Sequence, residues 1–183
     1  MIEFEAMDLQ KTSHPLSEPS YGCAFCVTGK ETLLTQAIEE FCRDAKARAV
    51  RQEKRFTCKG QVTVRDEIVI KGYVFFMVPR ELEINEIIPP YDFIKPLTYS
   101  NGEWRLFGED EEYAKWIFKY DGTLNLSKAY QIGDRIEIID GPLKDLEGLI
   151  TRIDKRNRNG QITIQFGGKV QKIWLGFEIV KKL

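Results

Sequence analysis

Residues 133–154 read GDRIEIIDGPLKDLEGLITRID. Isoleucines alternate with charged residues at the start of this stretch, which is typical of a half-buried strand. Gly141-Pro142 then predicts a turn, and a short apolar loop containing Leu146 follows. Gly148 comes just before the next apolar run, where the absence of a side chain would relieve crowding at a corner. The stretch therefore predicts two β-strands joined through a tight corner.

Short apolar clusters continue after this corner, each separated from the next by a glycine-containing turn. They lie at 149–153, 162–166, 170–175 and 179–180. Strands this short and evenly spaced are typical of a small barrel. We expect residues 132–183 to form a five-stranded SH3-like β-barrel.

The pattern differs before this region. Residues 121–131 are polar and predict a linker, whereas residues 21–120 mix strand and helix patterns. The mixture predicts an α+β domain in which an antiparallel sheet is flanked by helices. Strands are expected at 21–27, 48–58, 61–70, 72–78 and 93–97, and helices after the Thr28-x-x-Glu31 capping box, at 80–88 and at 109–120. Residues 1–20 are rich in Pro and Ser and predict a flexible extension.

Composition excludes several classes of protein. The 183 residues are 43% hydrophobic and 30% charged, which excludes collagen-like and wholly disordered chains. The net charge of −1 argues against a surface that is basic all over. No apolar run approaches the roughly 20 residues of a membrane span. We expect a soluble, cytoplasmic protein whose four cysteines are reduced.

Two parts of the chain resemble known modules. The stretch around Gly141, Pro142, Leu146 and Gly148 strongly resembles the KOW motif, which is found in RNA-associated proteins. The run VIKGYVFF at 69–76, with the segment from Tyr21 to Glu31 and the helix after it, is similar to the N-terminal (NGN) domain of the NusG family of transcription elongation factors. The resemblance covers residues 21–183, domain order and linker included.

This resemblance implies a mechanism and a set of partners. The first domain would dock through an apolar patch, to which Tyr21, Ile70 and Tyr73 contribute, on the clamp helices of the largest subunit of RNA polymerase. Binding there would hold the clamp shut and so suppress pausing and termination, through its higher affinity for the closed state. The barrel would bind a ribosomal protein, a termination factor or RNA. We expect a monomeric antitermination factor.

Three positions depart from the family pattern. Ile70 and Lys71 stand where the family usually has an aromatic residue and a proline, and Gly22 replaces an aromatic residue after Tyr21. These departures favour a specialised paralogue of the LoaP or RfaH kind, and the ordinary β pattern of the barrel favours LoaP. Such a factor acts on selected operons and is recruited through a leader RNA hairpin. The alternative is a housekeeping NusG-like factor that couples polymerase to the ribosome or to a termination factor.

Two basic segments are candidates for contact with RNA. Residues 43–59 carry seven basic side chains against two acidic ones. The basic residues are Arg43, Lys46, Arg48, Arg51, Lys54, Arg55 and Lys59. The second segment is the turn containing Lys155, Arg156 and Arg158. Either segment could contact phosphates or simply be the solvated side of its element.

Rival functions are disfavoured by the same residues. Cys23 and Cys26 have metal-ligand spacing, but residues three apart on a strand point to opposite faces, so no metal site is expected. The sequence has one histidine, His14, and no phosphate-binding glycine loop. We therefore expect no cofactor, no catalytic residue and no enzymatic activity. A KOW-type RNA-binding protein that does not bind polymerase remains a second alternative.

Overall fold

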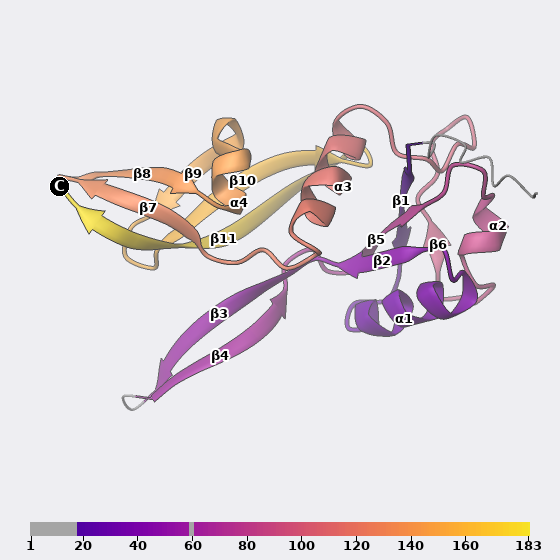
Figure 1. Cartoon of the computed structure of the whole chain (residues 1–183), viewed down its shortest axis with the longest axis horizontal. Coiled ribbons are helices and arrows are strands. Elements are labelled where there is room, and N and C mark those ends of the chain that lie inside the picture. Colours follow the sequence, from indigo (N-terminus) through magenta and orange to yellow (C-terminus); the bar gives the residue numbers. More distant parts are fainter. Residues whose placement is uncertain (1–17, 59–60) are drawn as a thin grey trace, which may run out of the picture.

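The computed structural model describes the backbone of residues 18–58 and 61–183, and all their side chains except those of 53–65. Two sheet-based units follow one another along the chain, as Figure 1 shows. The first contains β1 (Ser20–Phe25), α1 (Glu31–Phe41), β2 (Lys46–Ala49), β3 (Arg51–Cys58), β4 (Gln61–Ile68), β5 (Tyr73–Val78), α2 (Ile84–Ile87), β6 (Lys95–Pro96) and α3 (Glu109–Lys119). The predicted α+β domain is confirmed.

The sheet of the first unit has the strand order β2-β5-β1-β6 and is antiparallel throughout. The apolar run 73–78 lies inside it as β5, because its residues are buried on both faces and need cover from two sides. Strands β3 and β4 form the predicted hairpin, which projects away from the rest of the unit (Figure 1). A separate strand, β2, precedes the hairpin and joins the main sheet.

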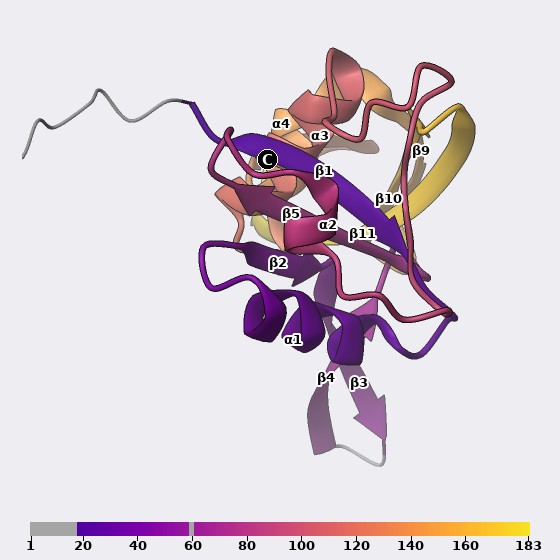
Figure 2. The same ribbon diagram turned by 90° about the vertical axis from the view of Figure 1, so that its right-hand side faces the viewer.

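The two faces of the sheet bury different side chains. Ala24, Val74 and Phe76 belong to the core on the side of α1. Cys23 and Phe75 alternate with them and belong to a core shared with α3 and the second unit. Figure 2 shows α1 on one side of the sheet and α3 on the other. The period of two along a strand thus divides the sheet into an α1 face and an α3 face.

The start of α1 differs from the predicted capping box. Lys30 occupies the N-cap, and no side chain caps this helix end. The Glu31 carboxylate is buried and accepts hydrogen bonds from the backbone N–H groups of Gly29 (2.8 Å) and Gly72 (2.7 Å). The carboxylate therefore ties the helix to the loop before β5, and Thr28 has no capping role.

The second unit is a strongly curled sheet with the strand order β8-β7-β11-β10-β9. Its strands are β7 (Ser127–Ile132), β8 (Arg135–Asp140), β9 (Ile150–Asp154), β10 (Asn159–Phe166) and β11 (Lys169–Lys182), with α4 (Pro142–Asp145) and a 3-10 turn (Glu147–Leu149) between β8 and β9. The predicted five-stranded KOW barrel is confirmed as this half-barrel sheet. Its strands are not all the expected ones.

Two differences account for the changed strand list. Residues 127–131, expected in the linker, form most of β7, which pairs with β8 and, in parallel, with β11. The clusters at 170–175 and 179–180 lie on one strand, because Gly176 between them does not turn the chain. A Cβ atom at Gly176 would lie 2.4 Å from the Leu126 side chain, so this glycine allows a close approach.

The two motif glycines have different roles at the corner. Gly141 has φ of 94°, and a Cβ atom there would lie 2.8 Å from the Ser127 Cα atom. Next to it, the Leu143 N–H donates to the buried Ser127 hydroxyl at 2.9 Å. Nothing lies within 4 Å of a Cβ atom built on Gly148, whose φ is not positive. The expectation that Gly148 relieves crowding is wrong, and Gly141 has that role.

Candidate functional site

The three residues expected in the docking patch share one apolar cluster. Tyr21 on β1 and Tyr73 on β5 both lie on the α3 face, on either side of the paired residues Cys23 and Phe75. Ile70, just before β5, is 4% exposed and belongs to the same cluster. The Tyr21 ring packs against α3, with its centroid 5.6 Å from that of Phe118.

In this structure the second unit covers the Tyr73 end of that face. The Phe166 ring of β10 lies 5.0 Å from the Phe75 ring and 6.1 Å from the Tyr73 ring, centroid to centroid. The Gln171 side-chain amide donates to the Tyr73 hydroxyl at 3.0 Å. Burial raises the pKa of Tyr73, although the hydrogen bond from Gln171 acts in the opposite direction. We call this set of contacts the interdomain contact.

Polar groups of α3 hold the same part of the second unit. The backbone N–H of Gly167, in the turn between β10 and β11, donates to the Asp110 carboxylate at 3.2 Å. The Tyr99 hydroxyl donates to that carboxylate at 2.8 Å. A Cβ atom at Gly167 would lie 3.2 Å from the Leu97 side chain, so the turn fits closely against the first unit.

A second polar contact joins the C-terminal end of α3 to α4. The Lys119 ammonium and the Tyr120 hydroxyl each lie 2.7 Å from the Asp145 carboxylate. Burial, the largest single effect, raises the pKa of Asp145, but the hydrogen bonds from Lys119 and Tyr120 together outweigh it. The pKa of Asp145 is therefore lowered, and the ion pair is charged at neutral pH.

The basic segment 43–59 does not form one continuous patch of available charges. Arg48 lies between two carboxylates, with its guanidinium 2.8 Å from Glu39 and 2.7 Å from Asp121. It joins β2 to the end of α3, and its charge is neutralised there. The structure thus argues against Arg48 as a phosphate contact, because its hydrogen-bonding capacity is used within the domain.

The other residues of the segment have different surroundings. Arg43 and Lys46 are exposed at the turn between α1 and β2. Arg51 donates to the Thr32 hydroxyl at 2.6 Å, at the base of the hairpin. Lys54 and Arg55 lie on β3, where only the backbone is described, and Lys59 lies outside the described residues. Their part in RNA binding stays a prediction.

The second basic turn lies at the β9–β10 connection, where Lys155, Arg156 and Arg158 are all exposed. Asp154 shapes the turn, because its carboxylate accepts the Asn157 N–H at 2.9 Å and the Asn157 side-chain amide at 2.8 Å. These hydrogen bonds lower the pKa of Asp154. The turn therefore presents its three cations from a defined backbone.

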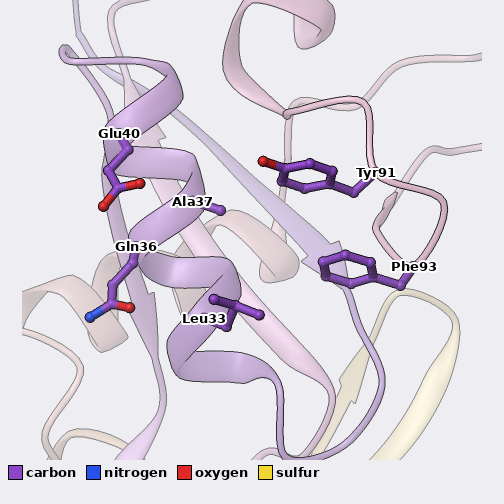
Figure 3. Close-up of a pocket in the computed structure, with 6 residues that line it drawn as sticks. All are labelled: Leu33, Gln36, Ala37, Glu40, Tyr91 and Phe93. Atoms are coloured by element: carbon purple, nitrogen blue, oxygen red, sulfur yellow. The ribbon is translucent and has the colours of Figure 1, made fainter.

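One surface feature was missed by the sequence reasoning. An apolar groove of about 310 Å³ lies between α1 and the loop after α2 (Figure 3). The Tyr91 and Phe93 rings are stacked 5.5 Å apart and are 52% and 39% exposed, and they line the groove opposite Leu33 and Ala37. The signal in the sequence is Pro89-Pro90, which ends the preceding helix. A turn follows, in which the Ile94 N–H donates to the Tyr91 carbonyl at 3.0 Å.

Comparison with known proteins finds similarity to NusG proteins. No family model matches the chain. Over 139 residues, which are 68% of this chain and 73% of the relative, it is 24% identical to the transcription termination/antitermination protein NusG of Borreliella burgdorferi. The chain is therefore similar to a NusG protein over about two thirds of its length. A stretch of 56 residues is 34% identical to NusG of Rickettsia typhi, over 31% of this chain and 29% of that protein.

A solved structure of the NusG family also resembles the chain. It is described as "Domain interaction in Thermotoga maritima NusG", with a TM-score of 0.48 and 17% identity over 87% of this chain and 94% of that one. The curated relatives are named for transcription termination and antitermination. In the described part of the chain no helix is long and apolar enough to cross a membrane.

The two units follow the predicted order, an α+β domain and then a five-stranded sheet. The described residues include no cluster of three or more His, Cys, Asp or Glu side chains suited to a metal ion. Cys23 packs on the α3 face and Cys26 against the core on the α1 face, so the two thiols lie on opposite sides of the sheet.

Proposed function

We propose that this NusG-family protein is a transcription elongation and antitermination factor that binds the clamp helices of RNA polymerase through the α3 face of its first domain. The observation that carries the proposal is that the half-buried Tyr21 and Tyr73 lie on one face of the sheet and that the buried Ile70 belongs to the same apolar cluster. The similarity to proteins named for transcription termination and antitermination supports it. Docking there favours the closed clamp and so reduces pausing and termination.

Docking requires the second domain to leave the Tyr73 end of the face. Phe166 and Gln171 occupy the space that a polymerase helix needs next to Tyr73. Polymerase and the KOW domain therefore compete for one surface, and polymerase shifts the population towards an open form. The released KOW domain is then free to bind a ribosomal protein, a termination factor or RNA while tethered nearby.

Recruitment on selected operons through a leader RNA hairpin is the more specific part of the proposal. The exposed Arg43 and Lys46 and the basic residues of the β3 strand support it, since they lie on a projecting hairpin and the turn beside the sheet. The alternative, a housekeeping factor, is favoured by the relatives, which are themselves proteins named NusG. The two functions differ in whether a leader RNA is needed.

Transcription with purified core polymerase separates the two functions. One template carries the leader of the neighbouring operon before an intrinsic terminator, and a matched template lacks the leader. A specialised antiterminator is expected to increase read-through on the first template only, whereas a housekeeping factor affects both alike. If the protein neither binds polymerase nor changes read-through on either template, the proposed function is wrong.

Reversing one charge of the α3–α4 contact is expected to open the two domains. Asp145→Lys places a second cation beside Lys119, where an ion pair 2.7 Å long now holds α4. Because both partners are partly exposed, we expect a shift of about threefold to tenfold in the ratio of open to closed molecules. Small-angle scattering would record a larger radius of gyration, and pull-down would record stronger polymerase binding.

The charge-swapped variant is the matched control. Lys119→Asp combined with Asp145→Lys restores the ion pair with the two charges exchanged. The closed form and the original polymerase binding are therefore expected to return. Unchanged scattering for the single variant would show that this contact does not hold the domains together.

A further inference from the structure

The outer surface of strands β9, β10 and β11 carries polar, basic and aromatic side chains. Ile162, Ile164 and Phe166 of β10 are buried, so the residues between them face outward. The same alternation holds along β11, where Ile173, Leu175 and Phe177 point inward. We call one part of this outer surface the Trp174 face. Its members are Arg152, Gln161, Thr163, Lys172 and Trp174.

Strand register aligns these side chains in rows. Gln161 pairs with Arg152 on one side and with Trp174 on the other, which gives one row across three strands. Thr163 pairs with Lys172 in the next row. The Arg152 guanidinium carbon lies 5.9 Å from the centroid of the Trp174 ring, so a cation lies beside the ring. An indole ring, a cation and two hydrogen-bonding side chains thus lie together.

Trp174 differs from the other two tryptophans of the chain. Trp104 and Trp116 are 3% and 6% exposed and belong to the apolar cores. Trp174 is only partly buried, and it lies on the outside of the sheet among polar neighbours. A large aromatic ring left accessible on a strand surface gives up part of the free energy that burial would supply. An accessible aromatic ring beside basic side chains is typical of a surface that binds single-stranded nucleic acid.

The cations on and beside the Trp174 face are not used in ion pairs. Among the described residues, none of Arg152, Lys155, Arg156, Arg158 and Lys172 forms an ion pair, whereas cations such as Arg48, Arg105 and Lys119 do. The nearby Asp154 carboxylate is occupied by two hydrogen bonds from Asn157. The Lys155 ammonium donates to the backbone carbonyl of Asp134, which leaves its charge without an ion-pair partner. Five positive charges without an ion-pair partner therefore lie on or beside this face, in a chain whose net charge is −1.

We propose that the Trp174 face binds single-stranded RNA, with an unstacked base on the Trp174 ring and phosphates on Arg152, Lys172 and the Lys155–Arg158 turn. An accessible ring next to cations suits a polyanion whose bases are free to stack on the ring. The bases of a duplex are already stacked on one another, so a single strand is the better partner. Gln161 and Thr163 supply hydrogen-bonding groups for a base edge or a ribose 2′-hydroxyl. The choice of RNA over DNA rests on the proposed function, because an elongation factor works beside the nascent transcript.

The Trp174 face remains accessible in the closed arrangement. The contacts between the two units described above use Phe166, Gly167, Gln171 and Asp145 of the second unit, and none of these belongs to the Trp174 face. RNA binding is therefore measurable on the full chain without polymerase. Failure of this inference and failure of the proposed function are then distinguishable, because polymerase binding is a separate assay.

The test is a fluorescence titration of the full chain with oligouridine of about 12 nucleotides, a length within the range that small β-barrel domains bind. Stacking on the indole is expected to quench the fluorescence of Trp174, since the other two tryptophans are buried. Trp174→Leu is expected to abolish the quenching and to weaken binding about tenfold, whereas Trp174→Phe keeps most of the affinity. Arg152→Gln is expected to reduce the dependence of affinity on salt concentration.

The double variant Lys181→Gln and Lys182→Gln is the control for charge. It changes exposed cations at the far end of β11 and is expected to leave both quenching and affinity nearly unchanged. Thermal unfolding checks that each variant folds. The inference is wrong if a folded Trp174→Leu protein binds as tightly as the parent, or if the parent does not bind oligouridine. Equal affinity for the matching single-stranded DNA overturns the choice of RNA, and equal affinity for duplex RNA overturns the stacking geometry.

Discussion

Tyr73→Ala is expected to weaken binding of core RNA polymerase about 30-fold, whereas Tyr73→Phe does not weaken it. The alanine removes a ring that lies among Phe25, Phe75 and Phe166 on the α3 face and that the proposed docking reuses. The phenylalanine keeps the ring and removes only the hydroxyl that accepts from Gln171. Because that bond belongs to the closed form, its loss favours opening. A binding titration of each full-length variant with purified polymerase measures the difference.

Tyr91→Ala is the matched control for this pair. Tyr91 is also a partly exposed tyrosine of the first domain, but it lies in the groove beside α1 rather than on the α3 face. It is expected to bind polymerase like the parent protein. If Tyr73→Ala stays folded and binds normally, or if Tyr91→Ala loses as much affinity, the docking surface is not the α3 face.

The elements that the sequence predicted well are those whose burial has a local cause. The run from Tyr73 to Val78 is apolar on both faces and is flanked by Gly72 and Pro79, so a buried strand follows from six residues. The corner at Gly141 also has a local cause. Glycine readily adopts the positive φ that this turn requires, and Pro142 follows it directly. Strand β7 was missed because its first residue, Ser127, is polar yet buried, and its hydroxyl accepts a hydrogen bond from the Leu143 N–H, 16 residues away.

The candidate site was harder to predict because charges find partners far along the chain. The sequence predicts Arg48 as a phosphate contact. In the fold, however, its guanidinium lies 2.7 Å from the carboxylate of Asp121, which is 73 residues away. The interdomain contact joins Tyr73 to Gln171 over 98 residues. No periodicity encodes such pairs. Single-sequence patterns therefore predict candidate docking residues, but they do not show that the second domain covers Tyr73.

Gly22→Ala is expected to destabilise the first domain by about 1–3 kcal/mol, through overpacking against Phe76. A Cβ atom at position 22 would lie 2.2 Å from Cζ and 2.4 Å from Cε2 of the Phe76 ring. That ring is fully buried and lies 5.6 Å from the Trp104 ring, so it has little freedom to move. Gly148→Ala is the control, because a Cβ atom there meets open space. Chemical denaturation of the three proteins gives the free energies of unfolding.

A double-mutant cycle with Phe76→Leu tests whether the absence of a side chain at Gly22 makes room for the Phe76 ring. Gly22 and Phe76 are paired across β1 and β5, and the ring lies over the glycine. An aromatic residue at position 22, as the NusG family usually has, does not fit beside this phenylalanine, so the two positions share one volume. If so, Phe76→Leu costs less in the Gly22→Ala background than in the parent, with a coupling of about 0.5–3 kcal/mol. Additive effects would mean that Gly22 is not explained by Phe76, and that the departure at position 22 has another cause.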